Sequence, residues 1–136
     1  MDADAAEDWV RSWAASVSDR AAQAQEMSRR VADLTATAAG ADGAVRVTVA
    51  ASGIVADLRL DDRVRSWPAT RIAAEIMATT RRAQARLAGA VADVAAQTAG
   101  PDSETARAVV ASYTTRFPEP PEESDETVHS RRRGER

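Results

Sequence analysis

Three arginines, Arg81, Arg82 and Arg86, lie within six positions of one another. A guanidinium is a planar fork of N–H donors that matches the oxygens of a phosphate group, so this cluster suits a ligand that carries phosphates. The alternative is a solvated helix face on which Glu75 and Asp93 pair with the arginines. The sequence leaves both interpretations open.

Other arginines are second candidates for the same role. Arg71 lies on the same predicted helix and could extend the cluster, while Arg29 and Arg30 form a separate pair. Arg46 and Arg59 fall on the polar face of two predicted strands. A symmetric dimer would present each of these groups twice, which raises the local positive charge available to an anion.

The chain offers little for catalysis or metal binding. Asp61-Asp62 could bind a metal or act as acid and base, but no third ligand, no Gly-rich phosphate loop and no nucleophile with a base accompanies them. A strand-end acidic turn explains the pair better. There is no cysteine, and His129 is the single histidine. We therefore expect no enzyme activity, no catalytic residue, no metal and no cofactor.

Larger apolar side chains are scarce. Leu, Ile, Val and Phe together make up 21 of 136 residues, below the level typical of a well-filled core. Such a chain is partly disordered or completes its core with a second subunit. The formal net charge is -3, and residues 1–99 hold 12 Arg against 13 Asp and Glu. Phosphate binding would therefore be weak or locally focused.

Residues 5–34 are predicted to form one long helix. Apolar residues recur there at spacings of three and four, with one gap that Arg20 fills. A seam of this length favours a partner helix. Trp9 and Trp13 lie one turn apart, and they either pack in a core or dimer interface or stack on nucleobases. The seam consists of Val10, Trp13, Val17, Ala24, Met27, Val31 and Leu34.

A small antiparallel sheet should follow this helix. Residues 45–50 alternate Val with other residues, and residues 54–60 alternate in the same way. The short connection at Ser52-Gly53 predicts a hairpin. Residues 35–38 are a candidate third strand. One face of the hairpin is apolar and must be covered by helices. It is expected to carry Val45, Val47, Val49, Ile54, Ala56, Leu58 and Leu60.

A second long helix is predicted from Pro68 to about Thr98. Pro68 suits the first turn, Ser66 is the expected cap, and Gly100-Pro101 ends the helix.

The last part of the chain changes character. Residues 100–117 predict a weaker helix after a Ser103 cap, and residues 118–136 are rich in Pro and acidic residues and are expected to be disordered. Arg131-Arg132-Arg133 could contact nucleic acid. The acidic run from Glu119 to Glu126 could instead fold back on these arginines or repel DNA.

The order and spacing of these segments are similar to those of the YbaB/EbfC family of nucleoid-associated proteins. That family shows a G-x-V-x-V-x-V strand, a small-residue turn, a strand with an acidic end, and a Pro-started helix with a basic middle. The likeness covers roughly residues 5–98, while Lys is absent where the family is usually Lys-rich. It is carried by Asp33–Thr37, Gly43–Val49, Ser52-Gly53, Asp57–Asp61, Pro68–Ile72 and Thr79–Gln84.

The resemblance implies an α+β protomer: a long helix, a small antiparallel three-stranded sheet and a long helix, in an intertwined homodimer. It places a dimerisation and DNA-binding domain at residues 1–99, before the helix at 100–117 and the tail at 118–136. The residues expected to contact DNA are Arg81, Arg82, Arg86, Arg71, Arg29 and Arg30. The residues expected at the dimer interface are Trp13, Val17, Met27, Val31, Val47, Leu58, Ile76 and Leu87.

The function implied by the resemblance is sequence-tolerant binding of double-stranded DNA by a cytoplasmic, nucleoid-associated or regulatory protein. The alternative is a non-catalytic adaptor that keeps the fold and has lost DNA binding. We expect no membrane partner, because no apolar run approaches 18 residues and the start, Met1-Asp2-Ala3-Asp4, lacks the features of a signal peptide.

Overall fold

The computed structural model describes residues 2–121, and it confirms the α+β class and the predicted order of elements. The elements are α1 (Asp2–Ala32), β1 (Thr35–Gly40), β2 (Val45–Ala50), β3 (Val55–Leu60), the 3-10 helix η1 (Asp62–Ser66), α2 (Ala69–Thr98) and α3 (Glu104–Arg116). Most of the segment expected to be disordered, from residue 122 onward, lies outside the described residues.

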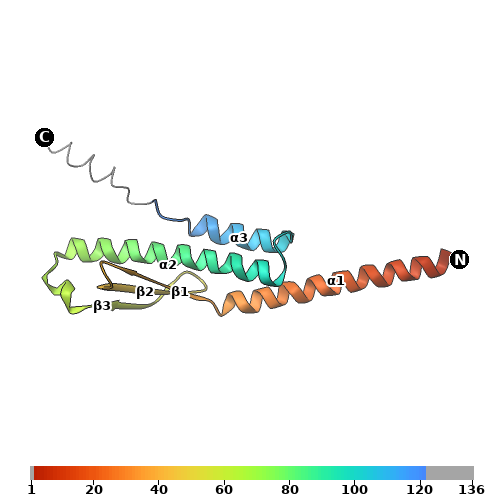
Figure 1. Cartoon of the computed structure of the whole chain (residues 1–136), viewed down its shortest axis with the longest axis horizontal. Coiled ribbons are helices and arrows are strands. Elements are labelled where there is room, and N and C mark those ends of the chain that lie inside the picture. The colour runs from red at the N-terminus through yellow and green to blue at the C-terminus, as the bar shows by residue number, and fades with distance from the viewer. Residues whose placement is uncertain (1, 122–136) are drawn as a thin grey trace, which may run out of the picture.

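The sheet has the order β1-β2-β3, and both neighbouring pairs are antiparallel. α2 lies across the face formed by β1 and β2 (Figure 1). The alternation predicted for β2 is confirmed, because Val45, Val47 and Val49 are fully buried under this helix together with Leu87 of α2. Small residues of β1, such as Ala38, let the helix approach closely.

The pairing of β3 differs in one place from the alternation read from the sequence. Leu58 and Leu60 lie opposite Val47 and Val45 as expected, but a register shift places Val55, rather than Ala56, opposite Val49. Ile54 is consequently 69% exposed. The extra residue is a β-bulge, which reverses the side-chain alternation beyond it and cannot be seen in a simple alternating pattern.

β3 is an edge strand that α2 does not cover. Val55, Leu58 and Leu60 are each more than 40% exposed, although their partners on β2 are fully buried. An apolar edge strand left open in this way is a site for pairing with another chain. The single protomer therefore leaves part of the sheet's apolar face in solvent.

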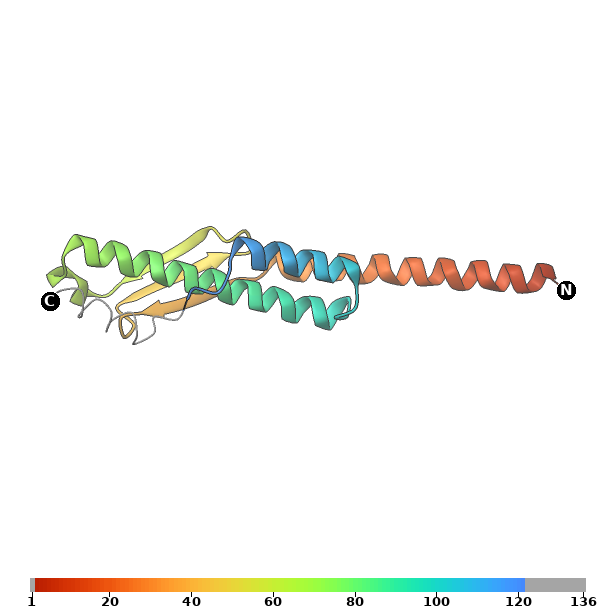
Figure 2. The same cartoon turned by 90° about the horizontal axis from the view of Figure 1, so that it is seen from above.

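The two halves of α1 have different surroundings. Met27 and Val31, near its C-terminal end, belong to the core, whereas residues 3–23 are all exposed. Figures 1 and 2 show this N-terminal half projecting beyond the rest of the protomer. We call residues 3–23 the arm. Among the described residues, no helix is both long and apolar enough to cross a membrane.

α3 packs along α2 and is more firmly placed than the sequence suggested (Figure 2). Ser103 caps it as predicted, accepting a hydrogen bond from the Ala106 N–H at 3.3 Å. The Tyr113 hydroxyl donates to the carbonyl of Ala51 at 2.7 Å, and the Phe117 ring lies against Gly53. Gly53 has φ +86 and leaves no room for a side chain, so this turn requires glycine. α3 is thereby fixed to the β2–β3 turn.

The start of α2 differs from the prediction. Residues 62–66 form η1, and Ser66 lies inside it, donating to the carbonyl of Arg63 at 3.2 Å instead of capping α2. Pro68 occupies the N-cap position of α2 and makes no side-chain cap. Proline lacks an N–H and has a fixed φ, so it can begin a helix without a capping side chain.

Candidate nucleic-acid interface

The middle of α2 presents the predicted arginine cluster on a rigid support. Ala83 and Leu87 are fully buried against the sheet and fix the rotation of the helix. Arg81, Arg82 and Arg86 then fall on its exposed side. Because the helix is anchored along one face, the backbone positions that carry the three arginines cannot shift relative to one another without disturbing the core.

Arg82 is held against strand β1. Its Nη2 donates to the main-chain carbonyl of Ala39 at 3.3 Å and to the hydroxyl of Thr79 at 3.1 Å. This approach depends on Gly40, since a Cβ there would lie only 2.5 Å from both Arg82 Nη2 and Thr79 Oγ1. The sequence pattern did not predict this contact between Arg82 and β1.

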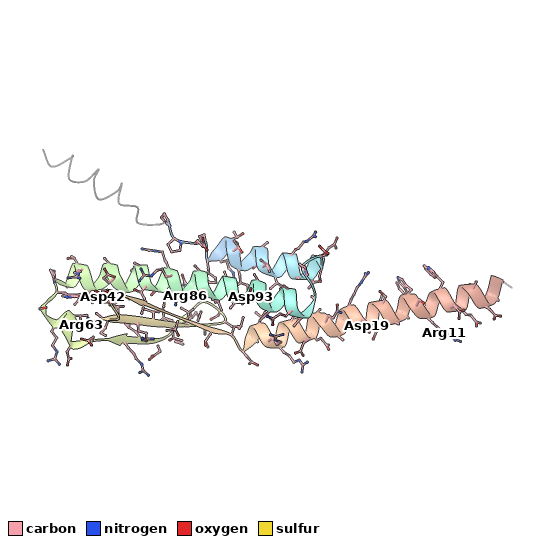
Figure 3. All side chains as sticks on the ribbon, viewed as in Figure 1. Arg11, Asp19, Asp42, Arg63, Arg86 and Asp93 are labelled. Atoms are coloured by element: carbon pink, nitrogen blue, oxygen red, sulfur yellow. The ribbon has the colours of Figure 1, made fainter. Side chains whose placement is uncertain are left out.

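Arg86 is held in the same manner one turn further along. Its Nη1 donates to the main-chain carbonyl of Thr37, also on β1, at 2.8 Å. Figure 3 shows Arg86 on the part of α2 that lies over the sheet. A guanidinium has five N–H donors, so Arg82 and Arg86 each keep others for an external acceptor. The anchors reduce the side-chain entropy that anion binding would cost.

The three arginines share one surface groove. α2 contributes Ala78, Arg81, Arg82, Ala85 and Arg86, and residues 119–121 complete the lining. The groove has a volume of about 600 Å³. Within residues 2–121, neither Glu75 nor Asp93 forms an ion pair with these arginines. The neutralising pairs of the alternative interpretation therefore do not form in the described part of the chain.

The other three predicted contact residues lie outside this groove. The Arg71 guanidinium stacks on the Trp67 ring, 3.8 Å from its centroid. Arg29 forms an ion pair with Glu26 on α1. Arg30 donates to the side-chain carbonyl of Gln97 at 2.7 Å and so joins α1 to the end of α2. The structure brings together three of the six predicted arginines.

The outer face of the sheet carries two further arginines. Arg46 and Arg59 are directly opposite each other on β2 and β3. Arg59 forms an ion pair with Asp57 at 3.0 Å, and both side chains are more than half exposed. An exposed pair of this kind contributes little to stability. This face is polar and open, and it is a weaker candidate for phosphate contact than the groove because Asp57 offsets its charge.

Asp61 and Asp62 have a structural explanation. The Asp61 carboxylate accepts the main-chain N–H of Arg63 at 2.9 Å and its Nε–H at 3.1 Å, which caps η1. These hydrogen bonds, the main-chain one first, hold the pKa of Asp61 below its ordinary value. Asp62 pairs with Arg65 in solvent. Among the described residues, no group of three acidic, His or Cys side chains is placed to hold a metal.

A comparison with protein families matches residues 11–101 to the YbaB/EbfC DNA-binding family. The chain belongs to the YbaB/EbfC DNA-binding family. The match covers most of α1, the whole sheet and α2, and it confirms the resemblance found in the sequence. Membership in YbaB/EbfC supports DNA binding as the general function. Comparisons with curated proteins and with solved structures gave no match.

The eight residues expected at a dimer interface separate into two groups. Met27, Val31, Val47 and Leu87 lie in the protomer's own core, and Ile76 is partly buried against it. Trp13, Val17 and Leu58 are exposed. The sequence could not separate the groups, because one apolar seam runs the whole length of α1 although only its end meets the core. In this conformation of the YbaB/EbfC protomer, only the three exposed residues are accessible for contact with a second protomer.

Proposed function

We propose that the protein is a homodimeric, nucleoid-associated or regulatory protein of the cytoplasm. It binds double-stranded DNA through its phosphate backbone, with little dependence on base sequence. The observation that carries this proposal is the groove in which Arg81, Arg82 and Arg86 converge. Membership in a DNA-binding family supports it independently.

The arrangement favours phosphate contacts over base readout. Arg82 and Arg86 are held close to the sheet by main-chain carbonyls, so their reach is short. Phosphate contacts position a protein on a duplex without reading its sequence. The described residues do not form a helix-turn-helix or a zinc module, which are common means of base-specific reading.

The local charge of α2 is consistent with this role although the chain is acidic. α2 carries four arginines against two acidic residues, whereas the arm carries more acidic residues than arginines. A focused basic patch can attract a polyanion when the net charge does not. We expect the affinity to be modest and confined to low and moderate salt.

A homodimer is supported by the apolar surface that the protomer leaves exposed. Val55, Leu58 and Leu60 form an open strip on β3, and Trp13 and Val17 form a stripe on the arm. Burying both would stabilise the assembly by about 25 cal/mol for each Å² of apolar surface removed from water. A dimer would also present two arginine grooves to one duplex, which strengthens binding through effective concentration.

The test is a binding titration against two duplexes of unrelated sequence at several salt concentrations, with sedimentation equilibrium as the dimer control. We expect a dimer, similar affinities for both duplexes and a steep loss of affinity with salt. A strong preference for one duplex would contradict backbone recognition. A folded dimer that binds neither duplex at low salt would favour the adaptor function, for which the exposed Trp9 and Trp13 on the acidic arm offer a protein-binding surface.

A further inference from the structure

The arginine groove is bounded on one side by the chain that leads into the C-terminal segment. Glu119, Pro120 and Pro121 line the groove together with Arg81, Arg82 and Arg86. This places the start of a sequence rich in Pro and acidic residues beside the most basic surface of the protomer. The position is produced by the fold and is not evident from the sequence, in which these two segments are more than thirty residues apart.

Two contacts fix the point from which this segment departs. The Tyr113 hydroxyl bonds to the Ala51 carbonyl, and the Phe117 ring packs on Gly53. α3 therefore ends over the middle of α2, as Figure 1 shows. The prolines that follow restrict the backbone, so the chain leaves α3 in a defined direction.

The charge of the segment is complementary to the groove. Residues 119–126 contain Glu119, Glu122, Glu123, Asp125 and Glu126 and no basic residue. From Ala78 to Arg86 the basic face of α2 is about 12 Å long, at 1.5 Å per residue. Five extended residues beyond Pro121 can reach about 17 Å, which is enough to cover this face.

We infer that the acidic segment 119–126 docks in the α2 arginine groove of its own chain and competes there with DNA phosphates. The competition with DNA rests on the proposed function, whereas the docking of the segment does not require DNA. Carboxylates occupy the N–H donors of Arg81, Arg82 and Arg86 at low salt, and a duplex must displace them to bind. Competition by the segment therefore lowers the affinity for DNA at low salt.

A matched pair of full-length variants tests the competition. The first neutralises the segment, with Glu119→Gln, Glu122→Gln, Glu123→Gln, Asp125→Asn and Glu126→Gln. The second neutralises five acids of the N-terminal half of α1, with Asp2→Asn, Asp4→Asn, Glu7→Gln, Asp8→Asn and Asp19→Asn. Both raise the formal net charge by the same amount.

At low salt we expect the first variant to bind a short duplex of arbitrary sequence about tenfold more tightly than the wild type, and the second to change affinity by about twofold at most. The difference should disappear at about 0.5 M salt, where exposed charges are screened. Equal gains in the two variants would show a general effect of net charge and would overturn the inference.

A second measurement detects docking without DNA. The chain has no cysteine, so Ala85→Cys in the groove can be combined with Ser124→Cys in the segment, and Ser112→Cys on the exposed side of α3 with Ser124→Cys as the control pair. We expect the groove pair to form its disulfide faster under mild oxidation, and to lose this advantage at high salt or with Arg81→Ala.

The two measurements separate the failure of this inference from the failure of the proposed function. If the groove pair cross-links in the salt-sensitive manner but no variant binds DNA, docking stands and the DNA-binding proposal falls. Equal rates for the two cysteine pairs, or a groove pair insensitive to Arg81→Ala, would overturn docking. A groove pair insensitive to Arg81→Ala would place the acidic segment on another partner, such as Arg131–Arg133.

Discussion

The two long helices, α1 and α2, are nearly equal in length but differ in packing and in charge. α2 is packed on the sheet along one side, and its exposed side carries four arginines against Glu75 and Asp93. The arm of α1 is exposed along its whole length, and its acidic residues outnumber Arg11 and Arg20. Figure 3 shows Arg11 on the projecting arm, far from Arg86 over the sheet.

This difference indicates separate roles. A basic face on a fixed helix is suited to a rigid polyanion, because the helix fixes the points from which the charged side chains extend. Most of the stability of a helix in a protein comes from packing of its apolar side, so an exposed helix with an apolar stripe favours a partner. Trp9 and Trp13 are 66% and 59% exposed on that helix. We therefore propose that α2 contacts DNA and that the arm contacts protein.

The largest effect on stability should come from the anchored helix. Leu87→Ala removes a fully buried side chain between α2 and the sheet and is expected to lower the free energy of unfolding by about 2–5 kcal/mol. Thermal unfolding measures this directly. Met77→Ala, at a residue of α2 that is 56% exposed, is the control and should change little. Similar effects for both would mean that α2 is not packed as described.

The close approach of α2 to β1 gives the next largest effect. Gly40→Ala places a Cβ against Thr79 and Arg82 and should destabilise the fold by about 1–3 kcal/mol. Gly89→Ala is the matched control, because nothing lies near that position and alanine favours a helix interior. It should stabilise the protein by up to about 1 kcal/mol. A neutral Gly40→Ala would argue against the anchoring of Arg82 on β1.

The arm should affect association more than folding. Trp13→Ala with Val17→Ala removes two exposed apolar side chains and is expected to weaken self-association about tenfold. The unfolding temperature of this double variant, extrapolated to low protein concentration, should match that of the wild type. Sedimentation equilibrium provides the measurement. An unchanged dimer would leave the open strip on β3 as the whole interface.

The smallest effect concerns the cap of η1. The pKa of Asp61 is lowered in the fold, so its contribution to stability is present above the unfolded-state pKa of about 4 and is lost as the pH falls through the lower folded value. Asp61→Ala should lower Tm by a few degrees at pH 7 and by less near pH 3. An equal decrease at the two pH values would contradict the role of the charged carboxylate.

Local patterns were sufficient for much of the fold. The valine alternation predicted β2 and its buried face, and residues 100–117 with the Ser103 cap predicted α3. The bulge at β3 and the docking of Phe117 on Gly53 were not predicted, because each depends on residues that are distant or out of register.

The candidate site was predictable only in part, for the same reason. Helical spacing identified Arg81, Arg82 and Arg86 as one cluster, and the structure places them in one groove. Spacing could not show that Arg82 and Arg86 bond to carbonyls of β1, nor that residues 119–121 complete the lining of the groove. These interactions join segments far apart in the sequence, and no local periodicity encodes them.

The salt dependence of DNA affinity in Arg81→Ala tests the central claim most directly. Arg81 lines the groove but forms no hydrogen bond or ion pair within residues 2–121, so this variant should fold normally, whereas replacing Arg82 also removes its bonds to Ala39 and Thr79. The magnitude of the salt slope should fall by about one for each phosphate that a subunit no longer neutralises. Arg11→Ala, which removes the same charge from the arm, should leave the slope unchanged. An unchanged slope in Arg81→Ala, or an equal decrease in Arg11→Ala, would contradict the assignment of DNA to α2.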